Sequence, residues 1–148
     1  MNLLSETAVW RSTAEFVDAE GNISPGIGES RIEISAFGIT NESWLELKGN
    51  KIINNYQIFK EDDHKYQFQS DNMTLGIQKG CFNVDRNILF SKFVVEGTDL
   101  NGFEIIVRNK NECHAKGALY KNDQLVNSWR AVMVKKPSGV RMGFKVNS

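Results

Sequence analysis

Apolar and polar residues alternate along most of this chain in short stretches, and Gly, Asn and Asp turns separate the stretches about every 8–12 residues. The alternation is clear in residues 10–16, where Trp, Ser, Ala and Phe lie on one face and Arg, Thr and Glu on the other. A period of two is typical of half-buried strands. It predicts about ten strands, over residues 8–17, 29–36, 43–48, 51–59, 65–70, 73–79, 88–96, 102–108, 112–120 and 124–135.

Short connections between these stretches predict a meander in which each strand pairs with the next, because parallel neighbours need long crossovers. An open meander leaves two unpaired edges, and closing the sheet removes them. We therefore expect an all-β fold: a single antiparallel up-and-down β-barrel of about 8–10 strands. It forms one domain over residues 1–148, with any helix limited to a short turn.

Hairpin loops predict which residues share a face of the sheet. Two-residue loops at 49–50, 71–72 and 122–123 and a three-residue loop at 109–111 set the register. In the last hairpin, one face carries Lys116 and Trp129 and the other carries Arg130. A buried lysine costs more than a buried arginine beside polar groups, so we expect Arg130 to point inward. The same pairing places Glu104 and Arg108 outside.

A few polar groups on an apolar inner wall are typical of small-molecule sites. Arg130 has two open interpretations: it stacks on Trp10 and closes the barrel, or it pairs with an anionic group of a ligand. The inward polar and aromatic residues expected to bind the ligand are Asn54, Tyr56, Tyr66, Phe68, Ser91, Phe93, Phe103, Ser128 and Arg130.

An inward tryptophan on the first strand and an inward arginine on the last resemble the calycins, which include lipocalins and fatty-acid-binding proteins. The chain also resembles small lipocalin-like bacterial domains of unassigned function in four short motifs: WRSTAEF, GESRIEI, ESWLEL and SWRAVMV. The resemblance implies a barrel that Trp10 and Arg130 close at one end, with Trp10 in a structural role.

Two features depart from the calycin pattern. Ala8 stands where lipocalins have the glycine of their Gly-x-Trp motif. Residues 18–28 are too few for the helix pair that covers the mouth of fatty-acid-binding proteins. We therefore expect a mouth that is open or covered by loops.

The formal net charge of the chain is zero, since 18 Lys and Arg balance 18 Asp and Glu. This balance does not favour nucleic acid as a partner. The chain shows no signal-like start and no membrane span, so we expect a cytoplasmic protein. Cys81 and Cys113 lack metal-site spacing, and His64 and His114 are expected in solvent. We therefore expect no metal and no cofactor.

The sequence leads to one functional hypothesis and two rivals. The first is the binding of a small hydrophobic or amphipathic, anionic ligand inside the barrel. The second is a lipocalin-like enzyme of isomerase, lyase or chromophore-attaching type, for which the face assignment offers no inward Asp, Glu or His. The third is a filled-core interaction module that uses Trp44 and Trp129 as exposed anchors. Neither the ligand nor the oligomeric state follows from the pattern.

Overall fold

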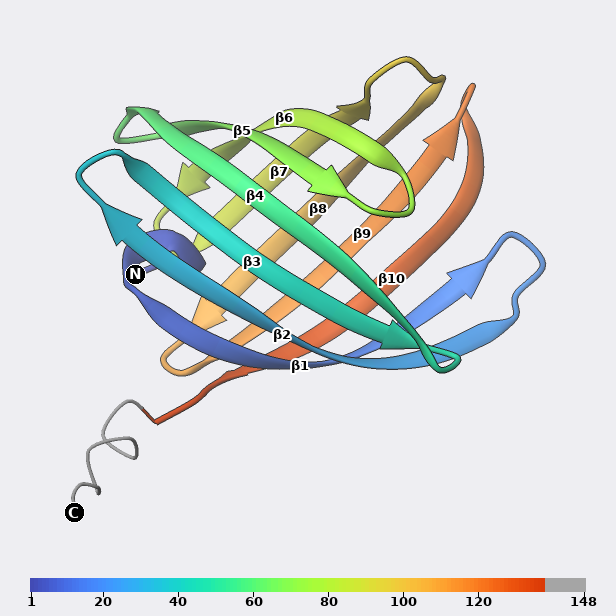
Figure 1. The fold of residues 1–148 in the computed structure, drawn as a ribbon, viewed down its shortest axis with the longest axis horizontal. Helices are drawn as coiled ribbons and strands as arrows, with labels where there is room; N and C mark the ends of the chain where they lie inside the picture. The colour runs from blue at the N-terminus through green and yellow to red at the C-terminus, as the bar shows by residue number, and fades with distance from the viewer. Residues whose placement is uncertain (138–148) are drawn as a thin grey trace.

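Ten strands follow one another along the chain, and each pairs antiparallel with its neighbour in the computed structural model, which describes residues 1–137 (Figure 1). β1 also pairs with β10, so the sheet closes into one barrel, and the all-β fold expected from the sequence is confirmed. Within the described residues, no helix has the length and apolar character needed to cross a membrane. The strands are β1 (Ala8–Asp18), β2 (Ile23–Ser35), β3 (Gly38–Leu47), β4 (Asn50–Asp62), β5 (Lys65–Asn72), β6 (Gly76–Asp85), β7 (Ile88–Val95), β8 (Leu100–Asn109), β9 (Glu112–Lys121) and β10 (Gln124–Lys135).

Two tight hairpins show how local sequence shapes the barrel. In the β3–β4 turn, Lys48 and Gly49 have φ values of 51° and 79°. In the β9–β10 turn, Asn122 and Asp123 have φ values of 49° and 65°. Two successive residues with positive φ form the turn whose twist matches a two-stranded ribbon, and Gly, Asn and Asp tolerate that conformation best.

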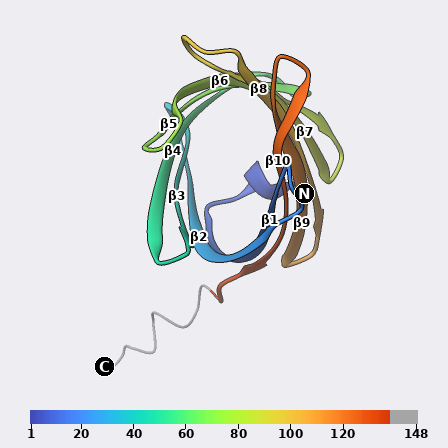
Figure 2. The same cartoon turned by 90° about the vertical axis from the view of Figure 1, so that its right-hand side faces the viewer.

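One end of the barrel is closed by the N-terminal segment. A short 3-10 helix, η1 (Leu3–Ser5), lies at this end, and Figure 2 shows it within the ring of strands. Its Leu3 and Leu4 side chains are buried. They join a core built from the inward residues near this end: Trp10, Ile32, Ile39, Ile58, Phe68, Phe82, Leu89, Ile106, Cys113, Ala115 and Met133.

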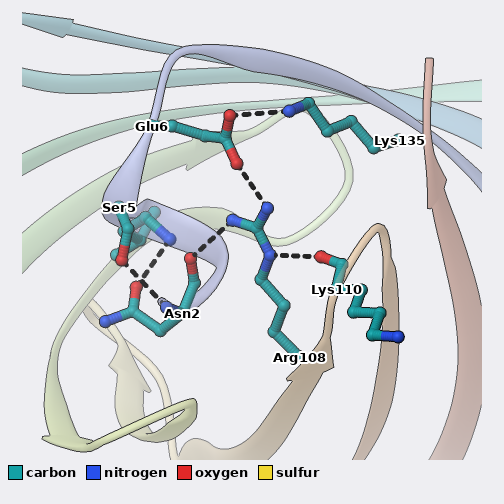
Figure 3. A network of polar contacts seen from close by, with 7 residues as sticks. Asn2, Ser5, Glu6, Arg108, Lys110 and Lys135 are labelled. Carbon is teal, nitrogen blue, oxygen red and sulfur yellow. Dashed lines mark hydrogen bonds and ion pairs between the residues drawn. The ribbon is translucent and has the colours of Figure 1, made fainter. Parts of the chain in front are cut away.

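Arg108 of β8 fastens the η1 segment to the barrel (Figure 3). Its guanidinium lies over the Trp10 ring, 5.0 Å from the centroid, and is bonded to Glu6. It also donates to the carbonyl oxygens of Asn2 at 3.1 Å and Lys110 at 2.7 Å. The arginine that closes this barrel on a tryptophan is therefore Arg108, and the expectation that Arg130 does so is wrong.

Glu6 sits between two cations in this network. Lys135 Nζ donates to Glu6 Oε1 at 2.6 Å, and Arg108 binds the other carboxylate oxygen. These hydrogen bonds, that of Lys135 first, lower the pKa of Glu6 below 4.5. The stabilisation is therefore present above the ordinary glutamate pKa and is lost as the pH falls through the lowered one.

Three strands show the opposite face from the one predicted, each because a turn or bulge differs by one residue. The β8–β9 loop has two residues, since Asn109 pairs with Glu112, so Glu104 and Arg108 point inward. The β5–β6 loop is longer than predicted, which turns Gln78 inward to Ser70. A bulge in β10 shifts its pairing with β9, and the positions beyond it exchange faces.

Candidate ligand-binding site

Beyond the closed end, the inner wall of the barrel is only partly buried on several strands. Inward residues near η1 have almost no exposed surface, whereas those farther along β1, β3, β4 and β10 keep part of theirs. This end has no helix across it in the described chain, and Figure 2 looks toward it. The partly exposed inner wall comprises Ser12, Ala14, Phe16, Asn41, Ser43, Leu45, Leu47, Ile52, Asn54, Tyr56, Phe93, Glu104, Asn127, Trp129 and Ala131.

Most of the residues proposed from the sequence do face the interior. Ser91 and Phe68 are buried, and Phe68 belongs to the core at the closed end. The Tyr56 ring lies 5.5 Å from the Phe68 ring, centroid to centroid. The inward members of the predicted set are Asn54, Tyr56, Tyr66, Phe68, Ser91 and Phe93.

Three residues of the predicted set lie on the outer face. The Arg130 side chain is 68% exposed, and its Nε lies 3.7 Å from Glu15. Ser128 shares its face, because the bulge exchanges both. Phe103 is 40% exposed and stacks on Tyr120, with ring centroids 6.4 Å apart. Their placement inside the barrel was wrong, and so was the prediction that Trp129 faces Lys116 outside.

A partly buried carboxylate lies on the inner wall, where the sequence predicted no acidic residue. Glu104 on β8 faces the interior, and Trp129 on β10 donates its indole Nε1–H to Glu104 Oε2 at 2.7 Å. The two strands are separated by β9, where Gly117 pairs with both residues. The indole crosses β9 over this glycine, and a Cβ there would lie 2.4 Å from the Trp129 ring. The missing side chain therefore allows the contact.

Burial dominates the electrostatics of this carboxyl group. It raises the pKa of Glu104 above 4.5, even though the hydrogen bond from Trp129 acts in the opposite direction. Burial also raises the pKa of Tyr56 above 10.0, and the charge of Glu104 adds to this effect. Tyr56 accepts a hydrogen bond from Asn54 Nδ2 at 3.3 Å. The interior therefore holds a carboxyl group and a phenol that both have raised pKa values, and the charge of the carboxyl group affects the pKa of the phenol.

Two amide side chains of the inner wall leave hydrogen-bonding capacity unused. The oxygens Asn41 Oδ1 and Asn54 Oδ1 are buried and have no partner among residues 1–137. Buried polar atoms are nearly always paired with protein, water or a ligand. In either orientation of its amide, Asn54 keeps one polar atom free beside Tyr56, so this wall offers hydrogen bonds to a bound molecule.

Sequence reasoning missed Glu104, Trp129 and Asn41 as interior residues. One signal for the first two was present: glycines at 102 and 117 interrupt strand patterns that are otherwise well filled. A glycine within a strand marks a place where another group approaches closely. Here these groups are the Phe93 ring over Gly102 and the Trp129 ring over Gly117.

Adding a methyl group at position 117 tests this arrangement. We expect Gly117→Ala to lower the free energy of unfolding by about 1–3 kcal/mol, since the new Cβ would overlap the Trp129 ring and the Phe103 carbonyl oxygen. Chemical denaturation measures the loss, and tryptophan fluorescence reports the displaced indole. An unchanged emission spectrum together with a loss below about 0.5 kcal/mol would contradict this geometry.

Other parts of the described chain are weaker candidates for a functional site. A hollow of about 800 Å³ lies at the closed end, between the ends of β1, β2 and β10. Arg11, Arg31 and Lys136 line it together with Glu6 and Glu33, so its charges are mixed. No group of three or more His, Cys, Asp or Glu side chains within residues 1–137 could hold a metal ion. Burial raises the pKa of Cys113 to about 11, which makes its thiol unreactive.

Comparison with known proteins supports the fold and goes no further. No protein-family model matches the chain, and no curated protein matches it. Among solved structures, an S-type phycobiliprotein lyase, CPES from Guillardia theta, is similar with a TM-score of 0.66 over 89% of each chain. The two sequences are 9% identical, so the similarity concerns the fold alone. The chain thus forms a closed ten-stranded antiparallel barrel, and its fold is similar to that of this lyase.

Proposed function

We propose that this protein binds a small amphipathic, mainly apolar molecule inside its barrel, through the end opposite η1. One observation carries the proposal: the inner wall is buried around Trp10 but stays partly exposed toward the other end on β1, β3, β4 and β10. On these strands the inner wall is free to contact a bound molecule. Small-molecule sites combine such an apolar wall with a few placed polar groups.

The chemistry of the exposed wall agrees with an amphipathic ligand. Leu45, Leu47 and Ile52 supply aliphatic surface on β3 and β4. Phe16 and Trp129 supply aromatic surface on the neighbouring strands β1 and β10, with ring centroids 6.0 Å apart. The polar groups of Asn41, Asn54, Tyr56 and Glu104 lie on the same wall and can orient the ligand.

The expected anionic character of the ligand is not retained. It rested on Arg130, which points to solvent. The inward cations of the closed end, Arg108 and Lys135, are already paired with Glu6. In the described chain, the inner positions between that network and the exposed rim carry no Lys or Arg.

Catalysis is the second candidate, and Glu104 is the observation that favours it. An inward carboxyl group with a raised pKa is suited to general acid chemistry. The fold is shared with a phycobiliprotein lyase, which is consistent with an enzyme on this scaffold. Fold similarity alone does not establish a reaction, so binding is the primary proposal.

Filling the inner wall provides the test. We expect a neutral hydrophobic fluorophore such as Nile red to bind the wild type, and Ala14→Phe to weaken it at least about 10-fold, or about 1.4 kcal/mol. Ala14 faces the interior between Gly26 and Ala131, so the larger ring would occupy the space. Fluorescence titration measures the affinity, and native mass spectrometry of the purified protein reports any co-purified molecule.

Thr13→Phe is the matched control, because Thr13 lies next to Ala14 in sequence but on the exposed face. It should leave the affinity for the fluorophore unchanged. Equal weakening by both variants would place the fluorophore on the outer surface. No binding to the wild type, with no co-purified molecule, would overturn the proposal.

A further inference from the structure

A carboxylate faces the interior with one oxygen uncommitted. Among the described residues, Trp129 is the hydrogen-bond partner of Glu104, and it uses Oε2 alone. A buried carboxylate without a cation is costly, and its pKa rises for this reason. A complementary ligand would therefore supply a hydrogen-bond donor for Oε1 and a positive charge.

The neighbours of Glu104 do not supply that charge. Ser91 on β7 and Gly117 on β9 pair directly with it, and Trp129 reaches it from β10. Tyr56 is close enough for the charge of Glu104 to raise its pKa, and it is neutral below pH 10. Lys121, the inward-facing lysine nearest the open end, lies at the exposed rim.

One aromatic ring lies beside the carboxyl group, and a second lies beyond the first. The Trp129 indole contacts it directly, and the Phe16 ring lies 6.0 Å from the Trp129 ring. Aromatic rings attract cations, and the carboxylate beside Trp129 adds a full opposite charge. Both features suit a protonated nitrogen better than an alcohol or an acid.

We propose that Glu104 recognises a protonated amine or amidine group on an otherwise apolar ligand, with Oε1 accepting its N–H beside the Trp129 indole. This inference rests on the proposed ligand-binding function and names the polar end of the ligand. The apolar part then lies along Leu45, Leu47 and Ile52, on the aliphatic side of the wall.

Three probes with the same alkyl chain separate the alternatives: dodecylamine, dodecanol and dodecanoate, each titrated by calorimetry below its micelle concentration at fixed salt. We expect the wild type to bind the amine most tightly and the acid most weakly. Glu104→Gln should weaken the amine by about 10- to 150-fold, the range of a charge-assisted hydrogen bond of about 1.5–3 kcal/mol. Dodecanol should bind both proteins alike.

Two further variants locate the effect. Glu15→Gln removes an outer carboxylate that lies near Arg130, and it should leave the amine affinity unchanged. Ala14→Phe should abolish binding of all three probes. Persistent amine binding to that variant would place the amine on the surface and overturn the inference.

Glu104→Gln should fold, because its amide oxygen can still accept from Trp129. The raised pKa makes wild-type stability fall as the pH rises from the ordinary glutamate value of 4.5 through the raised one. The variant should lack that loss in denaturation at several pH values. A folded variant that keeps the amine preference would overturn the role of Glu104.

The outcomes separate a failure of this inference from a failure of the proposed ligand-binding function. If dodecanol binds inside the barrel but the amine has no advantage, the inference fails and the binding function stands. If none of the three probes binds the wild type, both fail.

Discussion

Replacing Arg108 with methionine should lower the free energy of unfolding by about 3–5 kcal/mol, the range for removing one partner of a buried ion pair. The Arg108 side chain is 5% exposed and bonds Glu6, the Asn2 carbonyl and the Lys110 carbonyl. Methionine keeps most of the apolar stem but removes the Arg108 donors to both carbonyls and to one Glu6 oxygen, and the Asn2 carbonyl then keeps only the Ser5 N–H. Urea or guanidinium denaturation measures the loss.

Arg130→Met is the control for this experiment. Arg130 is also an arginine on a strand, but it is exposed and lies 3.7 Å from an exposed Glu15. Surface pairs of this kind contribute little, so the change should stay within about 0.5 kcal/mol of the wild type. Similar losses in the two variants would contradict the assignment of Arg108 as the closing residue.

Trp10→Ala should cost about 3–5 kcal/mol, because it removes a large aromatic side chain with 0% exposed surface. Trp10 belongs to the core beneath η1 and lies under the Arg108 guanidinium. Its loss therefore leaves a void and removes the face on which the cation rests. Denaturation by chemical titration and by heat should both show the loss.

Trp44→Ala is the matched aromatic control. Trp44 lies on the outer face of β3, where Lys51 Nζ is 4.6 Å from its ring centroid. Its removal should cost clearly less than removal of Trp10. The double variant Trp10→Ala/Arg108→Met should lose less than the sum of the single losses, since the two residues share a contact. A loss below about 1 kcal/mol for Trp10→Ala would show that the closed end does not depend on it.

Strand existence followed from the sequence because alternation is a local property. Residues 10–16 alternate whichever way the barrel closes, and so do the inward Leu89, Phe93 and Val95 of β7. The predicted loop at 49–50 is off by one residue at each end, since Leu47 pairs with Asn50 around Lys48 and Gly49. The pairing is therefore shifted by an even number of residues, so Leu45, Ile52 and Tyr56 keep the predicted face.

Face assignment failed where one residue decided it. The local sequence around Lys110 is compatible with a loop of either two or three residues. The sequence near the bulge in β10 does not predict it. The true registers bring Arg108 to Trp10 and Glu6, and Glu104 to Trp129. Their partners are far away in sequence, so a short stretch of sequence does not contain the contacts that stabilise these registers.

The sequence by itself therefore determined the strands, their antiparallel order and the inward face of β1, β2, β3, β4, β5, β7 and β9. Tertiary structure alone decided that Arg108 closes one end and that Glu104 lies on the inner wall, where no acidic residue was expected. The physical reason is that strand formation follows from side-chain alternation. Which charged residue turns inward depends instead on whether distant strands deliver a partner that offsets its desolvation.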